Sequence, residues 1–391
     1  MAVFDITNLC NLSCVYCNRY MSEKIDAVKE PAYDEIIGIF KDITKTQIKQ
    51  LALQGGEPFM RKDLYDIIEE MSDIKSAVHM NVKASWKCLA EKQLIKNKFF
   101  LASYVNMKQM KFPIISVTTN GTIYNPRLQE LFFQKNIHME VSLDTTIAEI
   151  HNRKRSGGRD TFTTVTNNIR EYAKNLPVVI KSTIDSDNVN NMIELIDYAH
   201  ELDCVQIIFH PVRFVGKALN GASRIDWIEQ YVEQVKEIIE LGIQKKLPIL
   251  VEIILPVNFL RTRSDYLEMN QRLNMSSNLV LNFHSCTANQ AIEEIYITSC
   301  LDVYGCPQLL HFDEMKIGNL RDISILDIEH SHRYKKLQQM IKDRTNIKLC
   351  SGCDLVNACK GGCVAAGLVN ENQVNGNDLV CCRKGVGDNA V

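Results

Sequence analysis

The sequence predicts an α/β protein whose parallel sheet is covered by helices. Three observations carry this prediction. Short apolar runs alternate with amphipathic helical patterns in six successive units between residues 2 and 209, an order typical of parallel sheets with external helices. The 391 residues are 46% hydrophobic and 24% charged, as in ordinary globular proteins, and allow two or three domains. The last hundred or so residues are rich in cysteine, which sets them apart from the six units.

Each expected element follows from its residue pattern. Short runs of β-branched and apolar residues bounded by turn residues predict strands at 2–7, 49–54, 114–119, 138–143, 178–184 and 205–209. Apolar residues at helical spacing predict helices at 31–43, 62–71, 126–135, 161–174 and 191–202. A long helix at 225–245 and a strand at 249–255 are expected to connect this core to a C-terminal region with a helix at 325–341. The predicted divisions are a core at 1–215, a bridging region at 216–282 and a cysteine-rich domain at 283–391.

Residues 73–113 interrupt the alternation of strands and helices. A long insertion in a compact domain is often a lid or a binding loop, and an extra helical pair packed on the outside is the other possibility. Cys88 lies in this segment with no thiol close in sequence, and Cys204 opens the sixth strand. Both are expected to be buried small side chains.

Composition and charge exclude several classes. A net charge of −2 gives no basic field for nucleic acid or an anionic membrane. The sequence contains neither an apolar run of membrane-spanning length nor a signal segment, so we expect a cytoplasmic protein. Fourteen cysteines in a reducing compartment favour metal binding over disulfides. They gather at the two ends of the chain, which predicts two metal-bearing regions.

Cys10, Cys14 and Cys17 follow the first strand directly, and should therefore lie on the loop at its C-terminal end. Three clustered thiolates suit an iron–sulfur cluster. A four-iron cluster held by three thiolates leaves one iron open. A zinc site or a disulfide pair is the alternative, although zinc usually takes four protein ligands.

The spacing CxxxCxxC, with Tyr16 before the last cysteine, resembles the radical S-adenosylmethionine (SAM) enzymes. The resemblance implies a partial (β/α)6 TIM-like barrel whose strand ends hold the site. It also implies that SAM chelates the open iron of a [4Fe-4S] cluster and is cleaved by one electron to a 5′-deoxyadenosyl radical. That radical abstracts hydrogen from the substrate, and the protein positions and shields the chemistry.

Residues at the expected strand ends match SAM-contacting positions of the family. The turn at 55–58 follows the second strand, and in the family its Gly-Gly-Glu binds the SAM amino group. Arg155 matches an arginine near the SAM carboxylate, but Asn152 departs from the usual His-Asp-x-x-Arg, and a solvated cluster of basic residues is the alternative. The implied SAM-binding residues are Tyr16, Gly55, Gly56, Glu57, Pro58, Thr119, Asn120, Ser142, Asp144 and Arg155.

The C-terminal cysteines resemble the SPASM extension of radical SAM enzymes, which holds two auxiliary iron–sulfur clusters. The first ligand set that the resemblance implies is Cys286, Cys306 and Cys363, and the second is Cys350, Cys353, Cys359 and Cys381. Cys381 fits better than Cys382 because it follows Asp378 by three residues. Cys300 is either a fourth ligand of the first set or a buried thiol that leaves one iron open. Two structural zinc sites are the alternative for the whole region.

The catalytic residue itself is not predicted. His210 and Arg213 follow the sixth strand and either face the substrate, as an acid or base, or form a structural pair. Trp227, Tyr296 and Tyr304 are expected to pack.

The resemblance implies a peptide or protein maturase, forming for example thioether or carbon–carbon crosslinks in a ribosomal peptide. Formylglycine formation like that of anaerobic sulfatase maturases, a small-molecule radical dehydrogenase, and an electron carrier or sensor that never cleaves SAM remain open. A flavodoxin or ferredoxin would supply electrons. Only nine residues precede Cys10, so we expect no fused leader-peptide module; a separate protein or the 73–113 insertion would recognise a precursor.

Overall fold

The computed structural model describes residues 1–18, 30–78, 114–156, 159–219, 227–286, 295–378 and 380–381. Their strands form one eleven-stranded sheet in the order β11-β10-β9-β1-β2-β3-β4-β5-β6-β7-β8. Neighbours from β9 to β8 pair in parallel, whereas β10 pairs antiparallel with β9 and with β11. The strands are β1 Ala2–Asp5, β2 Gln50–Gln54, β3 Ile114–Thr119, β4 His138–Ser142, β5 Val178–Ile184, β6 Gln206–Pro211, β7 Leu250–Pro256, β8 Leu279–His284, β9 Ile295–Ile297, β10 Asp302–Tyr304 and β11 Gly318–Asn319.

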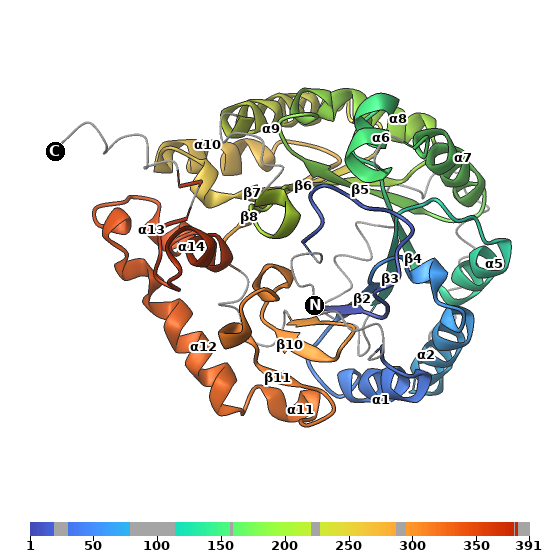
Figure 1. Cartoon of the computed structure of the whole chain (residues 1–391). Coiled ribbons are helices and arrows are strands. Elements are labelled where there is room, and N and C mark those ends of the chain that lie inside the picture. Colours follow the sequence, from blue (N-terminus) through green and yellow to red (C-terminus); the bar gives the residue numbers. More distant parts are fainter. Residues whose placement is uncertain are drawn as a thin grey trace.

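Helices surround this curved, open sheet on its outer side, and the C-terminal helices α12–α14 lie between its two edges, β8 and β11 (Figure 1). The core helices are α1 Tyr33–Ile43, α2 Leu64–Val78, α5 Pro126–Lys135, α6 Ala148–Ser156, α7 Phe162–Ala173, α8 Met192–Glu201, α9 Trp227–Ile243 and α10 Arg263–Leu273. The C-terminal helices are α11 Ile325–Ile328, α12 His332–Lys342, α13 Val356–Cys359 and α14 Val364–Glu371. No helix of the described residues is both long and apolar enough to span a membrane.

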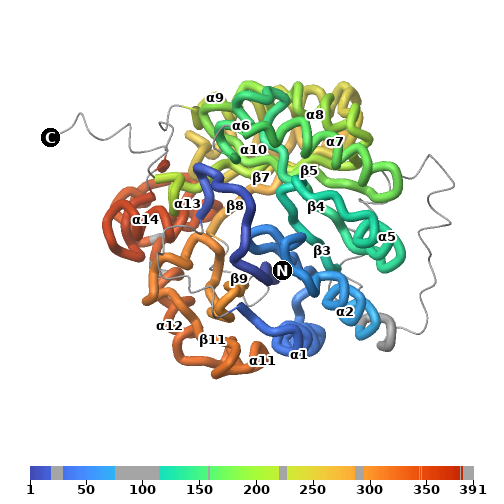
Figure 2. Tube along the Cα trace, turned by 45° about the vertical axis from the view of Figure 1, so that its right-hand side comes forward, coloured from blue at the N-terminus to red at the C-terminus, as the bar shows by residue number. Residues whose placement is uncertain are grey.

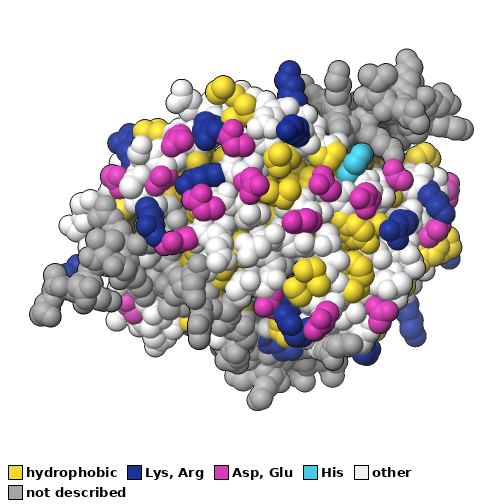
Figure 3. Space-filling model, turned by 90° about the horizontal axis from the view of Figure 1, so that it is seen from above, with side chains coloured by type: hydrophobic (Ala, Val, Ile, Leu, Met, Phe, Trp, Pro, Cys, Tyr) yellow, Lys and Arg dark blue, Asp and Glu magenta, His cyan; other side chains and the backbone are white. Residues whose placement is uncertain are grey.

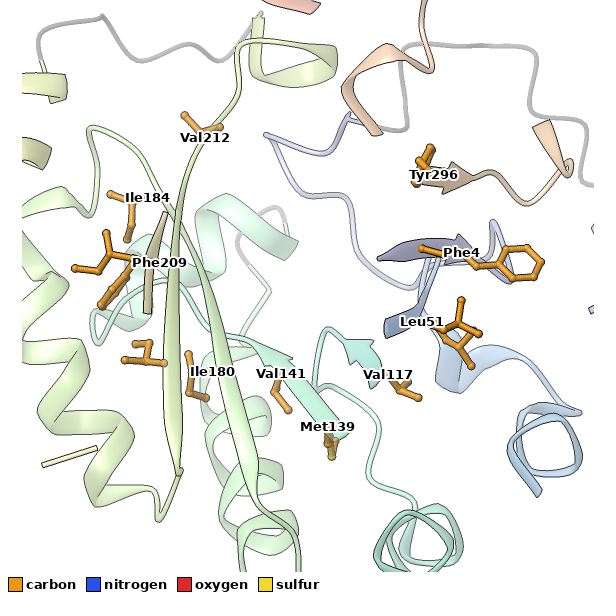
Figure 4. Packing of buried hydrophobic residues seen from close by; sticks show 14 of the residues in the cluster. Phe4, Leu51, Val117, Met139, Val141, Ile180, Ile184, Phe209, Val212 and Tyr296 are labelled. Carbon is orange, nitrogen blue, oxygen red and sulfur yellow. The ribbon is translucent and has the colours of Figure 1, made fainter. Parts of the chain in front are cut away.

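The hydrophobic core lies between the sheet and these helices. Side chains of successive strands, among them Leu51, Val117, Met139, Ile180 and Phe209, leave the sheet on its helical side (Figure 4). Because side chains of a strand alternate between faces, the residues between them point to the inner face of the barrel. On the outer face seen in Figure 3, acidic and basic side chains are interspersed, in keeping with the small net charge.

The predicted α/β fold is confirmed, including the six core strands and the parallel sheet. The bridging region does more than connect, because β7 and β8 continue the barrel sheet beyond β6. The helix expected at 325–341 is two helices: Ser331 accepts a hydrogen bond from the Tyr334 backbone N–H at 3.2 Å and caps a new helix, α12. Helix α2 runs to Val78, and residues 79–113 of the predicted insertion, with Cys88, lie outside the described residues.

Candidate active site

The loop that carries the first three cysteines, residues 7–18, is held against the turn after β2. Gly56 N–H donates to the Thr7 carbonyl at 2.7 Å, and Glu57 N–H donates to the Leu9 carbonyl at 2.6 Å. A Cβ on Gly55 would lie 2.4 Å from the Thr7 carbonyl oxygen, and one on Gly56 only 2.0 Å from that of Leu9. These two positions therefore need glycine because the cysteine loop packs directly on their backbone.

The other side of the cysteine loop contacts the end of α6 and the segment after β6. Ser13 and Val15 donate backbone hydrogen bonds to the carbonyls of Arg155 and Lys154, at 3.2 and 2.9 Å. Lys217 N–H donates to the Cys17 carbonyl at 3.3 Å. Figure 2 shows this N-terminal segment rising from β1 between the barrel and the C-terminal region. Three separate parts of the core thus fix the loop.

The three thiols of the loop share one environment. Burial raises the pKa of Cys14 to about 11; Arg155 opposes this shift, and the neighbouring Cys17 and Cys10 add to it. A thiol such as Cys14, whose ionisation burial and two neighbouring thiols disfavour, is stabilised as a thiolate by a bound cation, which fits a metal cluster at this loop. Among the described residues, no three His, Cys, Asp or Glu side chains converge closely enough to hold a single metal ion. A cluster does not require such convergence, because each thiolate binds a different iron.

A buried ion pair stands beside these thiols. Arg155 donates from Nε and Nη2 to the two carboxylate oxygens of Asp144, each at 2.9 Å, and the Tyr16 hydroxyl donates to the same carboxylate. Thr183 N–H donates to Asp144 Oδ1 at 2.8 Å. Burial alone would raise the pKa of Asp144, but the charges of Arg155 and Lys154 outweigh it and hold that pKa well below its usual range. The alternative of a solvated basic cluster is therefore wrong for Arg155, which is only 5% exposed.

Glu57 is fully buried and joins the turn after β2 to the end of β3. Its carboxylate accepts from Phe59 N–H at 3.1 Å, Thr119 Oγ1 at 2.7 Å and Asn120 N–H at 2.6 Å. Burial raises the pKa of Glu57, and these donors oppose the shift. In this arrangement the Glu57 side chain orients the neighbouring strand end. A direct contact of Glu57 with SAM stays a prediction.

The remaining predicted SAM residues lie at the same edge of the sheet. Asn120 donates to Asn11 in the cysteine loop at 2.8 Å, and its amide nitrogen lies 4.0 Å from Cys10 Sγ. Pro58 opens a short 3-10 helix, and Ser142 ends β4, paired in register with Lys181 on β5. The structure thus brings the predicted set together at the carboxyl ends of β1–β4, where barrel chemistry is expected.

The C-terminal cysteines separate into the two predicted groups. Burial raises the pKa of Cys306 well above its usual value, and Cys286 and Cys363 add to the shift, so these three thiols are neighbours. The backbone of Cys300 contacts Thr298, and its carbonyl accepts from Asn319 at 2.9 Å on the β10–β11 side. Whether Cys300 is a ligand stays open. The fitting donor set is Cys286, Cys306 and Cys363.

The second group lines a common pocket. Cys350, Cys353, Cys359 and Cys381 line it together with Asp378. Burial raises the pKa of Cys359 to about 12, with a contribution from Cys381. Cys382 lies outside the described residues. The interleaving predicted from the sequence agrees with this arrangement, since Cys363 stands between Cys359 and Cys381 in sequence but lies with the first group.

Two polar side chains brace this region. Asp378 accepts from Cys363 N–H at 2.6 Å and from Asn258 at 3.2 Å. Arg344 is fully buried and donates to the carbonyls of Gly361 at 2.6 Å and Cys363 at 3.3 Å. These contacts of Asp378 and the burial of Arg344 could not be predicted from the sequence, because an isolated arginine gives no sign of burial.

His210 and Arg213 lie close to charged groups of the inner barrel. Burial lowers the pKa of His210 to about 3, and Lys181 and Arg213 act in the same direction, with Glu140 opposing. His210 is therefore neutral. As expected, Cys204, Trp227, Tyr296 and Tyr304 are buried.

Comparisons with known proteins agree with this geometry. The model of the radical SAM superfamily matches residues 4–202, and the SPASM model, described as an iron-sulfur cluster-binding domain, matches residues 286–354. Mycofactocin maturase MftC of Mycolicibacterium smegmatis is 22% identical over 380 residues, which cover 97% of this chain and 81% of that protein. A probable GTP 3′,8-cyclase of Methanococcus aeolicus is 28% identical over 210 residues, 53% of this chain and 58% of that protein.

Solved structures share the fold over nearly the whole chain. Streptococcus suis SuiB bound to S-adenosylmethionine superposes with a TM-score of 0.67 at 16% identity, covering 97% of this chain and 76% of SuiB. Native anSMEcpe with bound AdoMet gives a TM-score of 0.68 at 18% identity, covering 97% and 94%. The predicted cofactors, SAM and iron–sulfur clusters, agree with both family models. With a model that matches more than half of its length and a cysteine loop of the matching spacing, the chain belongs to the radical SAM superfamily and carries a SPASM region.

Proposed function

We propose that this protein is a radical SAM/SPASM enzyme that modifies a residue of a peptide or protein substrate. Cys10, Cys14 and Cys17 would hold the [4Fe-4S] cluster that, with SAM bound, supplies a 5′-deoxyadenosyl radical. The chain's own residues hold the cysteine loop, orient the strand ends and surround the reacting site with buried groups. The product would be a modified side chain, such as a thioether or carbon–carbon crosslink in a ribosomal peptide.

The observation that carries this proposal is that one short segment lies next to cysteines from both ends of the chain. This segment is residues 213–217, which follow β6. At one end of it, burial raises the pKa of Cys363 in the first auxiliary group to about 11, and the nearby charge of Arg213 opposes this rise. At the other end, Lys217 donates to the carbonyl of Cys17. Clusters held by the Cys17 loop and by the Cys363 group would therefore be separated by only a few residues. This short separation supports a role for the auxiliary cluster in accepting an electron from the substrate or in binding the substrate directly.

The comparisons favour a peptide substrate over a nucleotide. The alignment with mycofactocin maturase MftC extends over 97% of the chain, whereas the GTP 3′,8-cyclases align only with part of it. SuiB has been solved with its precursor peptide SuiA, and anSMEcpe with the Kp18Cys peptide. The similarity to these structures is one of fold, so the substrate class remains our proposal.

Formylglycine formation in a target protein is the second candidate, favoured by the coverage of 94% of anSMEcpe. A small-molecule dehydrogenase would use the same core. An electron carrier is the weakest candidate, because the buried set around Glu57 and Asp144 has no use in a protein that only transfers electrons.

Partners follow from the chemistry. The N-terminal cluster would need a flavodoxin or ferredoxin as reductant, and a separate protein would recognise the leader of a precursor peptide. Thiol-rich cluster chemistry requires a reducing compartment, and the cytoplasm stays the predicted location.

The test is incubation of the anaerobically reconstituted protein with SAM, a reductant and candidate peptides encoded beside its gene. Mass spectrometry should find a peptide changed by the loss of hydrogen, in an amount that depends on SAM. Formation of 5′-deoxyadenosine without any change in these peptides or in a Cys- or Ser-containing sulfatase peptide would overturn the peptide proposal and favour a small-molecule substrate.

A further inference from the structure

A cluster of polar side chains lies on the inner face of the barrel, away from the cysteine sites. We call it the inner-face cluster, and its members are Glu140, Lys181, Gln206, Glu252 and Asn282. They come from five consecutive strands, β4 to β8. Barrel interiors are usually filled by branched apolar side chains. Polar side chains at these positions therefore call for an explanation.

Each carboxylate of the cluster has a different set of partners. Glu140 accepts from the Lys181 ammonium at 3.0 Å and from Thr118 Oγ1 at 2.7 Å. Glu252 accepts from two neutral amides only, Gln206 Nε2 at 2.9 Å and Asn282 Nδ2 at 2.6 Å. Among the hydrogen bonds of the described residues, a cation thus bonds to Glu140 and none bonds to Glu252.

A second observation also indicates that a hydrogen-bond donor is missing beside Glu252. Gln206 is 2% exposed, and its Oε1 has no hydrogen-bond partner among the described residues. Its Nε2 already donates to Glu252, so the unpartnered oxygen belongs to an amide that touches that carboxylate. A buried acceptor without a donor is costly, and here it stands beside a buried carboxylate without a cation. What the cluster lacks is a donor, and a charged donor would suit both groups.

The neighbouring charged groups do not supply a charged hydrogen-bond donor to Glu252 and Gln206. Burial raises the pKa of Glu252 to about 7, with Glu140 adding to the shift and Lys181 opposing it. Burial also lowers the pKa of His210 and of His284 to about 3, and Arg213 acts in the same direction on both, so these imidazoles are neutral.

The position suits a substrate group. Thr183, whose N–H bonds Asp144, pairs in register with His210, whereas Lys181 pairs with Ile208, and Ile208 pairs with Glu252. Lys181 and Glu252 therefore lie two residues, or about 7 Å, along the strands from the level of Asp144, and Glu140 and Gln206, which pair with Val179, lie four residues, or about 13 Å, from it. Solvent reaches the cluster at the Lys181 side chain, which is 31% exposed, whereas Glu252 and Gln206 are only 8% and 2% exposed, so a substrate group would reach them from the Lys181 side.

We propose that the inner-face cluster is a substrate subsite in which Glu252 and Gln206 bind a cationic N–H donor, an ammonium or guanidinium group. The inference rests on the proposed function, because it takes the substrate to enter the barrel. The group is recognised by two acceptors, the Glu252 carboxylate and Gln206 Oε1, and its charge is balanced by Glu252. A peptide side chain of lysine or arginine has this chemistry.

The test uses the full-length protein, reconstituted anaerobically, and four probes measured by calorimetry. N-acetyl-lysine amide and N-acetyl-arginine amide are compared with neutral counterparts of matching shape, N-acetyl-norleucine amide and N-acetyl-citrulline amide. At least one cationic probe should bind tenfold or more tightly than its neutral counterpart. Glu252→Gln should reduce this preference at least tenfold, whereas Glu233→Gln on the exposed side of α9 should leave it unchanged.

Equal binding of cationic and neutral probes to the unchanged protein, or an intact preference in Glu252→Gln, would overturn the subsite. Glu252→Gln should fold, because the Gln206 amide can turn so that its oxygen accepts from the new amide. Gln206→Met serves as a second variant and should weaken the cationic probe severalfold by removing one acceptor. The amount of 5′-deoxyadenosine formed from SAM without probe tests the proposed function separately, since its absence would leave the binding result standing.

Discussion

Arg155 and Asp144 form a two-pronged ion pair at the mouth of the barrel, with both N–O distances at 2.9 Å. The carbonyl of the same arginine accepts from Ser13 in the cysteine loop. One residue thus joins α6, the end of β4 and the loop that carries the first cysteines. The pair links the stability of the core to the geometry of the cluster site.

Removal of one partner of this pair should be costly. Asp144→Ala leaves Arg155 as a buried charge without its carboxylate, and we expect a loss of about 3–5 kcal/mol in the free energy of unfolding. Asp187→Ala breaks the exposed pair with Arg153 and should cost at most about 1 kcal/mol. Chemical denaturation of both variants measures the difference. Similar small losses in the two variants would show that the buried pair does not hold the site.

Gly56 should be required for the N-terminal cluster. In Gly56→Ala the new methyl group would lie 2.0 Å from the Leu9 carbonyl oxygen, and the cysteine loop would have to move. We expect the variant to lose about four of about twelve iron atoms per chain, the content of one four-iron cluster. Gly38→Ala is the matched control, because a Cβ at this position in α1 meets no atom within 4 Å. Full iron content in Gly56→Ala would refute the role of this contact.

These contacts also show why part of the site could be read from the sequence. The sequence shows three local signals: the cysteine spacing, the glycine pair and the polar residues after β3 and β4. Because the carboxyl ends of parallel strands lie at the same edge of the sheet, these signals could be placed in one site. Helix α6 carried no such signal. Its sequence buries His151, Lys154 and Arg155 instead of an apolar stripe, so helical periodicity of hydrophobic residues does not reveal it.

The inner face of the barrel could not be predicted for a related reason. Glu140 stands between apolar residues in a strand that alternates polar and apolar side chains, which is also the pattern of a strand with one face in solvent, and Glu252 is the single charged residue in an otherwise apolar strand. Only the closing curvature of the sheet makes that face interior. The continuation of the sheet by β7 and β8 likewise depends on pairing between strands that are distant in sequence. The local sequence of the bridging region does not predict this pairing.

The titration of Glu252 should be visible in the stability of the protein. Its pKa is raised from 4.5 to about 7 in the folded state, so the folded protein holds a proton that the unfolded chain has released. Stability contributed by this group is therefore lost as the pH rises from 4.5 to 7, by about 3 kcal/mol in total. Glu252→Gln removes this loss. The thermal midpoint of the variant should rise relative to the unchanged protein between pH 5 and pH 8, whereas a difference independent of pH would contradict the shift.

The second auxiliary group should depend on Cys381 and not on its neighbour. Cys381 lines the pocket shared with Cys350, Cys353 and Cys359. Cys381→Ala should lose up to about four iron atoms per chain and the corresponding part of the iron–sulfur absorption, while Cys382→Ala should keep both. The reverse result would transfer the ligand role to Cys382. A total near four iron atoms in the unchanged protein would reject both auxiliary clusters.

The central claim is that the cysteine loop holds a cluster that makes this chain cleave SAM. The most direct measurement is the yield of 5′-deoxyadenosine after anaerobic reconstitution and addition of SAM and a strong reductant, without any substrate. We predict that the unchanged protein and Cys204→Ala, which removes a buried thiol away from the predicted sites, form 5′-deoxyadenosine, and that Cys14→Ala forms none. An unchanged protein that forms none, or a Cys14→Ala variant that still forms it, would contradict the account.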